Sequence, residues 1–247
     1  FNWSVWMDSR RFFKTMGFPP DHTSAVARLS TTTITTWLLR AKAEWHRPLG
    51  EIALARFGSV AKPSHLSNAY GSAGKRTPEQ QANCVAYTKH VLACIPDNDL
   101  VAFTDGSAIP NPGPAGAGFS IWRGGTVLAE GSFPLGAGSN NIGEVSAVGL
   151  VSRLILASPT LLENTPAVFI LSDSKLGVEG LSGHAWIKSL GDLVRLASHH
   201  LDALSAAVPT RLLWIPGHVA TVGNDRADIR AKEGAVASAD MPPCHIQ

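Results

Sequence analysis

From residue 99 onward, the pattern of apolar and polar positions predicts short strands that are later separated by helices. Val168 to Leu171 is an uninterrupted apolar run, which is typical of a buried parallel strand. Gly124 and Gly125 separate two β-type runs and indicate a tight hairpin turn. The predicted strands cover residues 100–104, 116–122, 126–134, 168–171 and 211–215.

Helical periodicity fills the gaps between the later strands. In residues 141–157 the apolar side chains recur on neighbouring turns, at Val145, Val148, Val151 and Ile155. The other helices are predicted at residues 174–181, 187–207 and 222–236. The order β-β-β-α-β-α-α-β-α predicts an α/β domain over residues 99–240, with a mixed five-stranded sheet flanked by helices and a tail at 241–247.

Residues 1–98 show weaker periodicity and predict a mostly helical or irregular N-terminal extension and linker. One amphipathic helix is predicted at residues 36–57, interrupted near Pro48. Residues 58–78 are rich in Gly, Ser, Ala, Lys and Pro, as in a linker, and a short helix is predicted over 78–93.

Charge separates the two parts of this 247-residue chain, whose formal net charge is only +2. Residues 1–98 carry 12 basic and 6 acidic side chains, whereas residues 99–247 carry 9 basic and 13 acidic ones. A basic extension suits phosphate contacts, and an acidic domain offers carboxylates that a metal could neutralise. Simple variation of surface charge is the alternative interpretation.

The cysteines and the apolar runs exclude several classes of protein. Three cysteines without CxxC spacing argue against a disulfide framework and a structural zinc site. No apolar run approaches the ~20 residues of a membrane helix, so no membrane contact is expected. We expect an intracellular location, with the nucleus, the cytoplasm and the mitochondrion all left open.

Four acidic residues occupy related places in the predicted domain. Asp105 follows the first strand, Glu144 lies in the first turn of the next helix, Asp173 follows the fourth strand, and Asp228 lies in the last helix. Each has a structural explanation: a turn former, a partner of the helix dipole, a helix N-cap and a solvent-facing side chain. Together they form a specific combination, with acids after the first and fourth strands and in the helices that follow the third and fifth strands.

Five motifs surround these acids: Thr104-Asp105-Gly106-Ser107, Asn111-Pro112-Gly113-Pro114, Asn140-Asn141 before Glu144, Ser172-Asp173-Ser174, and Trp214-Ile215-Pro216-Gly217-His218 ten residues before Asp228. These motifs resemble type 1 ribonuclease H, and their sequences are more similar to the domains attached to retroelement reverse transcriptases than to the free enzymes. The resemblance covers residues 100–236.

This resemblance implies an endonuclease that hydrolyses the RNA strand of RNA–DNA hybrids with two Mg²⁺ ions, which Mn²⁺ could replace. The implied metal ligands and catalytic acids are Asp105, Glu144, Asp173 and Asp228. His218 would assist proton movement or product departure. Contacts to substrate, including the 2′-hydroxyl of the RNA, are implied for Gly106, Ser107, Asn111 and Asn141.

Two departures from the family pattern support an alternative. Ile142 and Gly143 replace the basic residue and methionine common in free enzymes, and Lys188 and Arg195 are the only basic residues in 186–209. The alternative is a non-catalytic subunit that binds structured RNA in a large ribonucleoprotein, for example a mitochondrial ribosome. The N-terminal extension either grips the hybrid for the enzyme or, as we favour, docks on a protein or ribonucleoprotein surface. A transposase, integrase or junction resolvase is disfavoured by the spacing of the acids.

Overall fold

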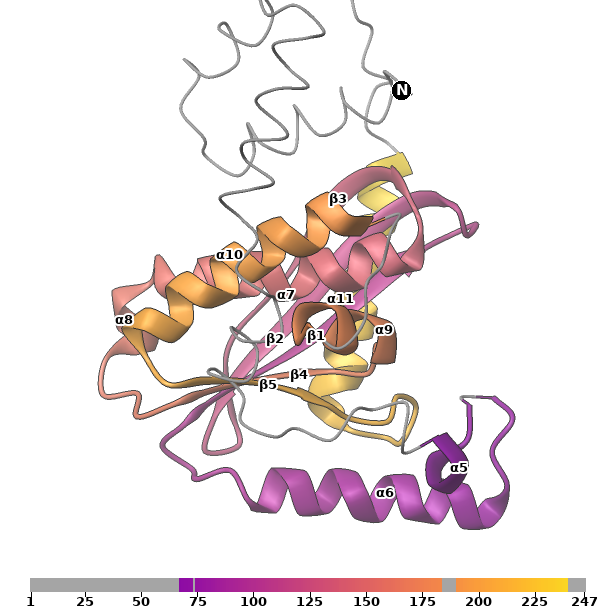
Figure 1. The fold of residues 1–247 in the computed structure, drawn as a ribbon, viewed down its shortest axis with the longest axis horizontal. Coiled ribbons are helices and arrows are strands. Elements are labelled where there is room, and N and C mark those ends of the chain that lie inside the picture. Colours follow the sequence, from indigo (N-terminus) through magenta and orange to yellow (C-terminus); the bar gives the residue numbers. More distant parts are fainter. Residues whose placement is uncertain (1–66, 73, 184–189, 240–247) are drawn as a thin grey trace, which may run out of the picture. The chain divides into compact units, whose positions relative to one another are not determined.

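The structure is a computed structural model that describes residues 67–72, 74–183 and 190–239 (Figure 1). The helix predicted at residues 36–57 and the tail at 241–247 lie outside the described residues. Among the described helices, none combines the length and the apolar character needed to cross a membrane.

A mixed sheet of five strands forms the centre of the domain, in the order β3-β2-β1-β4-β5 (Figure 1). The first three strands are antiparallel neighbours, whereas β1, β4 and β5 run parallel. The strand bounds are β1 Leu100–Ala108, β2 Gly113–Arg123, β3 Thr126–Gly138, β4 Val168–Ser172 and β5 Thr210–Trp214. The mixed five-stranded sheet predicted from the sequence is confirmed.

The hairpin between β2 and β3 has the predicted two-residue turn. Gly124 and Gly125 both have positive φ, at 52° and 77°, and their flanking residues Arg123 and Thr126 are paired. The prediction that β1 ends at Thr104 is wrong. The strand continues to Ala108 because its last residues pair with β2, a partner that periodicity within β1 does not reveal.

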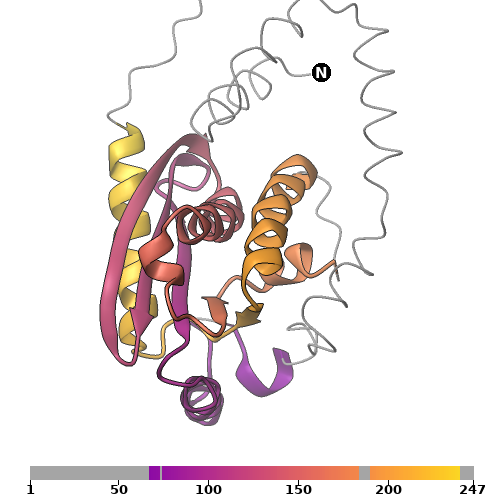
Figure 2. The same ribbon diagram turned by 90° about the vertical axis from the view of Figure 1, so that its left-hand side faces the viewer.

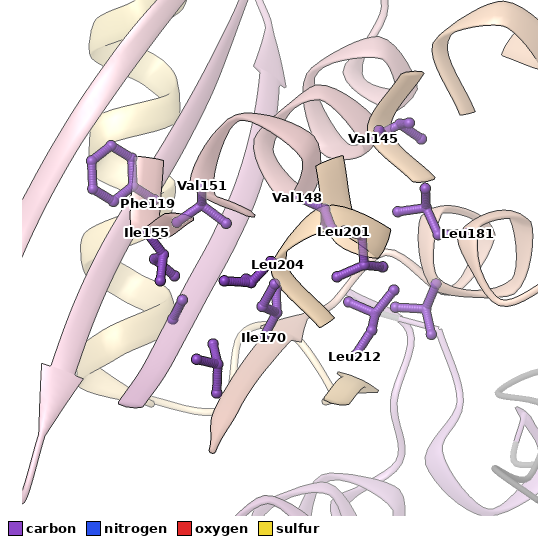
Figure 3. Close-up of a cluster of buried hydrophobic side chains, with 14 of the residues drawn as sticks. Phe119, Val145, Val148, Val151, Ile155, Ile170, Leu181, Leu201, Leu204 and Leu212 are labelled. Carbon is purple, nitrogen blue, oxygen red and sulfur yellow. The ribbon is translucent and has the colours of Figure 1, made fainter. Parts of the chain in front are cut away.

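Helices cover both faces of the sheet (Figure 2). On one face lie α7 Asn140–Leu156 and α10 Gly191–Ala207, and on the other lies α11 Val222–Ala239. The predicted apolar positions of α7 are all buried in the core, where they meet side chains of β4, β5 and α10 (Figure 3). The core residues that Figure 3 labels include Val145, Val148, Val151, Ile155, Ile170, Leu201, Leu204 and Leu212.

Shorter helices complete the described chain: α5 Ser67–Tyr70, α8 Pro159–Leu162 and α9 Lys175–Leu181. Neither α5 nor α8 was predicted, since four residues are too few to show a helical period. The helix predicted over 187–207 is described from Gly191, and residues 187–189 lie outside the described part of the chain.

The helix predicted over 78–93 is present as α6 Pro78–Ala93 (Figure 1), and its Val91 and Leu92 pack against the core cluster that contains Phe103 of β1. Thr77 begins it with a capping box, in which the Thr77 and Gln80 side chains pair reciprocally with backbone N–H groups. Cys84 of α6 is fully buried. The boundary at residues 98 and 99 stays a prediction, but residues before it contribute to this core.

Aromatic rings join α5 and α6 to the last strand. The ring centroid of Tyr87 lies 5.2 Å from that of Tyr70 and 6.0 Å from that of Trp214, at the end of β5. Tyr70 and Trp214 are 5.9 Å apart. Such tilted aromatic pairs contribute about 0.5–1.5 kcal/mol each beyond the apolar area that they bury.

We expect Tyr87→Ala to lower the free energy of unfolding by about 2 kcal/mol, because it removes two ring contacts and leaves a partial cavity. Thermal denaturation should then occur about 4–8 °C lower. Tyr87→Phe keeps the ring and is the control, which should melt within about 1 °C of the parent. Equal melting of Tyr87→Ala and the parent would show that α6 does not stabilise this domain.

Candidate active site

Three of the predicted acidic residues meet at one end of the parallel strand pair. Asp105 lies in β1, Glu144 in α7, and Asp173 directly after β4. One carboxylate oxygen from each lies within 4.8 Å of those from the other two. In the part of the chain that the structure describes, this is the one group of three or more potential metal-ligating side chains.

Strand register places the two aspartates side by side. The parallel pairing of β1 with β4 ends at Thr104 and Ser172, so Asp105 and Asp173 both follow the last paired residues. Asp105 still belongs to β1, where it pairs with Gly118 of β2. Its backbone is therefore held by β2 on one side, and only 8% of the residue's surface is exposed.

A close approach between α7 and β1 places Glu144 beside Asp105. A Cβ atom on Gly106 would lie 2.1 Å from the Glu144 backbone nitrogen, and one on Gly143 would lie 2.8 Å from the Gly106 Cα. Both positions therefore exclude a side chain. Glu144 is the fifth residue of α7, so the prediction that it lies in the first helical turn is wrong. The unusual Gly143 noted in the sequence has a packing role.

Two asparagines fix the beginning of α7. Asn140 Oδ1 accepts a hydrogen bond from the Ala108 N–H at 2.5 Å, and Asn111 Oδ1 accepts one from the Asn140 N–H at 3.2 Å. Asn111 therefore has a structural contact, while its contact with substrate stays a prediction. Asn141 is exposed beside it, and Ser107 is buried in β1.

Asp173 does not serve as the helix N-cap that its position allows. Ser174 has that role, since its Oγ accepts from the Gly177 N–H at 3.0 Å. The Asp173 Oδ2 instead accepts from Asn224 Nδ2 at 3.3 Å, and the indole N–H of Trp214 donates to the Asp173 backbone oxygen at 3.0 Å. The sequence analysis did not identify Asn224 as a site residue, although it lies only four residues before Asp228.

The fourth acid and the histidine lie outside the group of three. Asp228 Oδ2 accepts from Lys232 Nζ at 2.6 Å, one helical turn away. Its charge still raises the pKa values of both Asp105 and Asp173. His218 is exposed in the loop after β5, and its charge lowers the pKa of Asp173. The roles of Asp228 and His218 stay predictions.

Burial, followed by the charges of neighbouring acids, makes the three carboxyl groups hard to ionise. Burial, followed by the charge of Asp173, raises the pKa of Asp105 to about 8. Burial, followed by the charges of Asp105 and Asp173, raises the pKa of Glu144 well above its usual value. Burial also raises the pKa of Asp173, although the hydrogen bond from Asn224 opposes that shift.

These side chains fit a divalent cation. Glu144 as a whole is only half-buried, but its Oε2 is covered and has no hydrogen-bond partner among the described residues. A covered, unpartnered carboxylate oxygen beside two further carboxylates is costly unless a cation or a proton neutralises it. Since all the donors are oxygens, Mg²⁺ and Mn²⁺ suit the site better than metals that prefer nitrogen or sulfur.

Comparison with known proteins agrees with this geometry. The family model for RNase H matches residues 97–236, and the chain belongs to the ribonuclease H family. The chain is 35% identical over 156 residues to the Bifunctional protein Rv2228c of Mycobacterium tuberculosis, a match over 60% of this chain. It spans only 40% of the length of that relative.

Two further matches cover nearly the whole length of the matched chain, and the second of them is with a solved domain of the same mycobacterial protein. A Ribonuclease H of Jannaschia is 28% identical over 148 residues, which cover 55% of this chain and 90% of that protein. The solved N-terminal RNase H domain of rv2228c from Mycobacterium tuberculosis is 29% identical. That alignment covers 57% of this chain and 96% of the solved chain, with a TM-score of 0.45.

The raised pKa of Asp105 predicts how stability changes with pH in a chelator. Because the pKa is about 8 in the folded protein and about 3.9 in an unfolded chain, the folded state binds more protons between these values. The stabilisation that the folded state gains from this proton on Asp105 is complete below about pH 4 and is lost as the pH rises through about 8.

We therefore expect Asp105→Asn to melt higher than the parent at about pH 8.5 in EDTA, and by less at about pH 5. A difference of about 1–2 kcal/mol corresponds to several degrees. Asp225→Asn, which changes an exposed carboxylate on α11, is the control and should follow the parental curve. Parallel curves for Asp105→Asn and the parent would contradict the raised pKa.

Proposed function

We propose that this protein is an endonuclease that hydrolyses the RNA strand of RNA–DNA hybrids and requires Mg²⁺ or Mn²⁺. One observation carries the proposal: Asp105, Glu144 and Asp173 come from three separate elements, and their carboxylate oxygens lie within 4.8 Å of one another. Membership of the ribonuclease H family supports it. Burial, followed by the charges of neighbouring acids, raises the pKa of Asp105 and of Glu144, so these carboxyl groups oppose folding when they are ionised, and a role in binding a cation explains them better than a role in packing.

In this proposal, Asp105, Glu144 and Asp173 hold the metal, and Asp228 completes a second site. Bound divalent ions would stabilise the negative charge on the attacking and leaving oxygens of the phosphodiester. The Asn224 amide holds Asp173 Oδ2, which fixes the carboxylate and leaves Oδ1 for a ligand. Asp228 would exchange its contact with Lys232 for the metal.

His218 is proposed to move a proton at the reacting oxygens. Its imidazole is exposed, and its charge acts on Asp173, so it lies at the edge of the acidic group. Imidazole is the side chain that most often transfers protons to and from reacting groups in enzymes.

We assign recognition of the RNA strand to groups around the start of α7. Backbone atoms of Gly106 and Ser107, with the side chains of Asn111 and Asn141, would contact the 2′-hydroxyl that distinguishes RNA from DNA. Asn111 and Asn141 are both exposed, so they are accessible to a nucleic acid. The predicted docking of the N-terminal extension concerns mainly residues 1–66, which lie outside the described residues.

The proposal predicts that the purified protein cuts the labelled RNA strand of a hybrid with Mg²⁺ or Mn²⁺ and is inactive in EDTA. The reason is that the three carboxylates bind no phosphate unless a cation neutralises them. The same reaction with duplex DNA should give no product. Cleavage in EDTA, or equal cleavage of duplex DNA, would refute the proposal. Binding of the hybrid without cleavage would favour the alternative, a non-catalytic subunit that binds structured RNA.

Asp173→Asn should lower kcat by more than about 100-fold, because even a residue that only supports a metal ligand contributes 10–100-fold. The amide has the same shape, so the melting temperature should not fall. Asp192→Asn is a suitable control, because that carboxylate is 88% exposed, pairs with Arg195 and is not a member of the group of three acids. Parental turnover by Asp173→Asn would show that this residue is not a ligand.

A further inference from the structure

The loop that carries His218 is held by side chains from a part of the chain that precedes the family match at residues 97–236. The Arg76 Nη1 donates to the Gly217 backbone oxygen at 2.7 Å. The Gln81 Nε2 donates to the next carbonyl, that of His218, at 3.2 Å. Two consecutive backbone carbonyls of the loop thus accept hydrogen bonds from the N-terminal extension.

Arg76 is itself fixed by further contacts. Its Nε donates to the Tyr70 backbone oxygen at 3.0 Å, and its Nη1 also contacts Gln81 Oε1 at 3.4 Å. The guanidinium is planar and rigid, so these bonds define its position better than a lysine ammonium would. Gln81 lies in the first turn of α6, which the capping box and the aromatic contacts of Tyr87 hold against the domain.

The loop has a backbone conformation that needs such support. His218 and Ala220 have φ values of 57° and 54°, in the left-handed region that costs about 1–2 kcal/mol per non-glycine residue. Gly217 lies so close to Asp173 that a Cβ there would be 2.0 Å from the carboxylate oxygen. A small movement of this loop would therefore move both the imidazole of His218 and the Gly217 backbone that lies against the Asp173 carboxylate.

We propose that Arg76 and Gln81 are positioning residues, which fix the backbone of Gly217 and His218 and so present the imidazole at the acidic group. The inference rests on the proposed nuclease function for its catalytic consequence. The loop of Gly217 and His218 in the ribonuclease H domain is then held in part by residues of the N-terminal extension.

Hydrogen exchange in the full chain tests the contact without any need for activity. Backbone amides of residues 217–221 should exchange at least about 10-fold faster in Arg76→Ala and in Gln81→Ala than in the parent. Lys89→Ala is the matched control for Arg76→Ala, since it removes one positive charge from an exposed position on α6. Unchanged exchange in both variants would overturn the proposal, and Gln81→Ala keeps the test decisive if Arg76→Ala does not fold.

Cleavage kinetics test the consequence for catalysis. Arg76→Ala should lower kcat about 10- to 100-fold at nearly constant KM, and Lys89→Ala should not lower it. In a His218→Ala background, the same substitution should cost less than about 2-fold, because the group that it positions is gone. Equal costs in the two backgrounds would overturn the proposal. A parent that does not cleave, with faster loop exchange in Arg76→Ala, would refute the nuclease function while retaining the contact.

Discussion

Burial of Asp105, Glu144 and Asp173 close together is the constraint on which the rest of this structure depends. Burial, followed by the charge of Asp173, raises the pKa of Asp105 to about 8, so the ionised carboxyl group opposes folding. The surrounding elements nevertheless force the three together. Parallel pairing of β1 with β4 aligns the two aspartates, and the Gly106–Gly143 contact brings α7 close enough to add the glutamate. A fold that maintains such a costly arrangement is explained if a cation neutralises it.

The support around the site extends beyond the sheet itself. Trp214 donates to the backbone of Asp173 on one side and packs with Tyr70 and Tyr87 on the other. Arg76, between α5 and α6, reaches the loop of His218. The segment of residues 69–93 therefore contributes to the same structural unit as the acidic group, although it lies before the part of the chain that matches the family. Residues of the basic extension therefore support the part of the domain that carries the acidic group.

The periodicity of apolar residues was sufficient to predict the features that arise within one helix or strand. Val145, Val148, Val151 and Ile155 were predicted from their period, and their burial follows from it. Features that depend on a distant partner were not predictable in this way. The extension of β1 to Ala108 needs β2, the amide contact of Asn224 needs Asp173, and the support from Arg76 needs a loop 141 residues away in sequence. The motifs indicated the three acids that the fold brings together, whereas the pairing of Asp228 with Lys232, one helical turn away, is a local contact that helical spacing could have indicated.

Calorimetric titration of the full chain with Mn²⁺ near pH 7, in two buffers of different ionisation enthalpy, tests the central claim most directly. Because carboxyl groups with raised pKa values must lose protons before they bind a cation, the account predicts release of about one proton or more per protein molecule. Asp105→Asn should lose both the binding heat and the proton release. Binding of Mn²⁺ with no difference between the two buffers, or with the same heat in Asp105→Asn, would contradict the account.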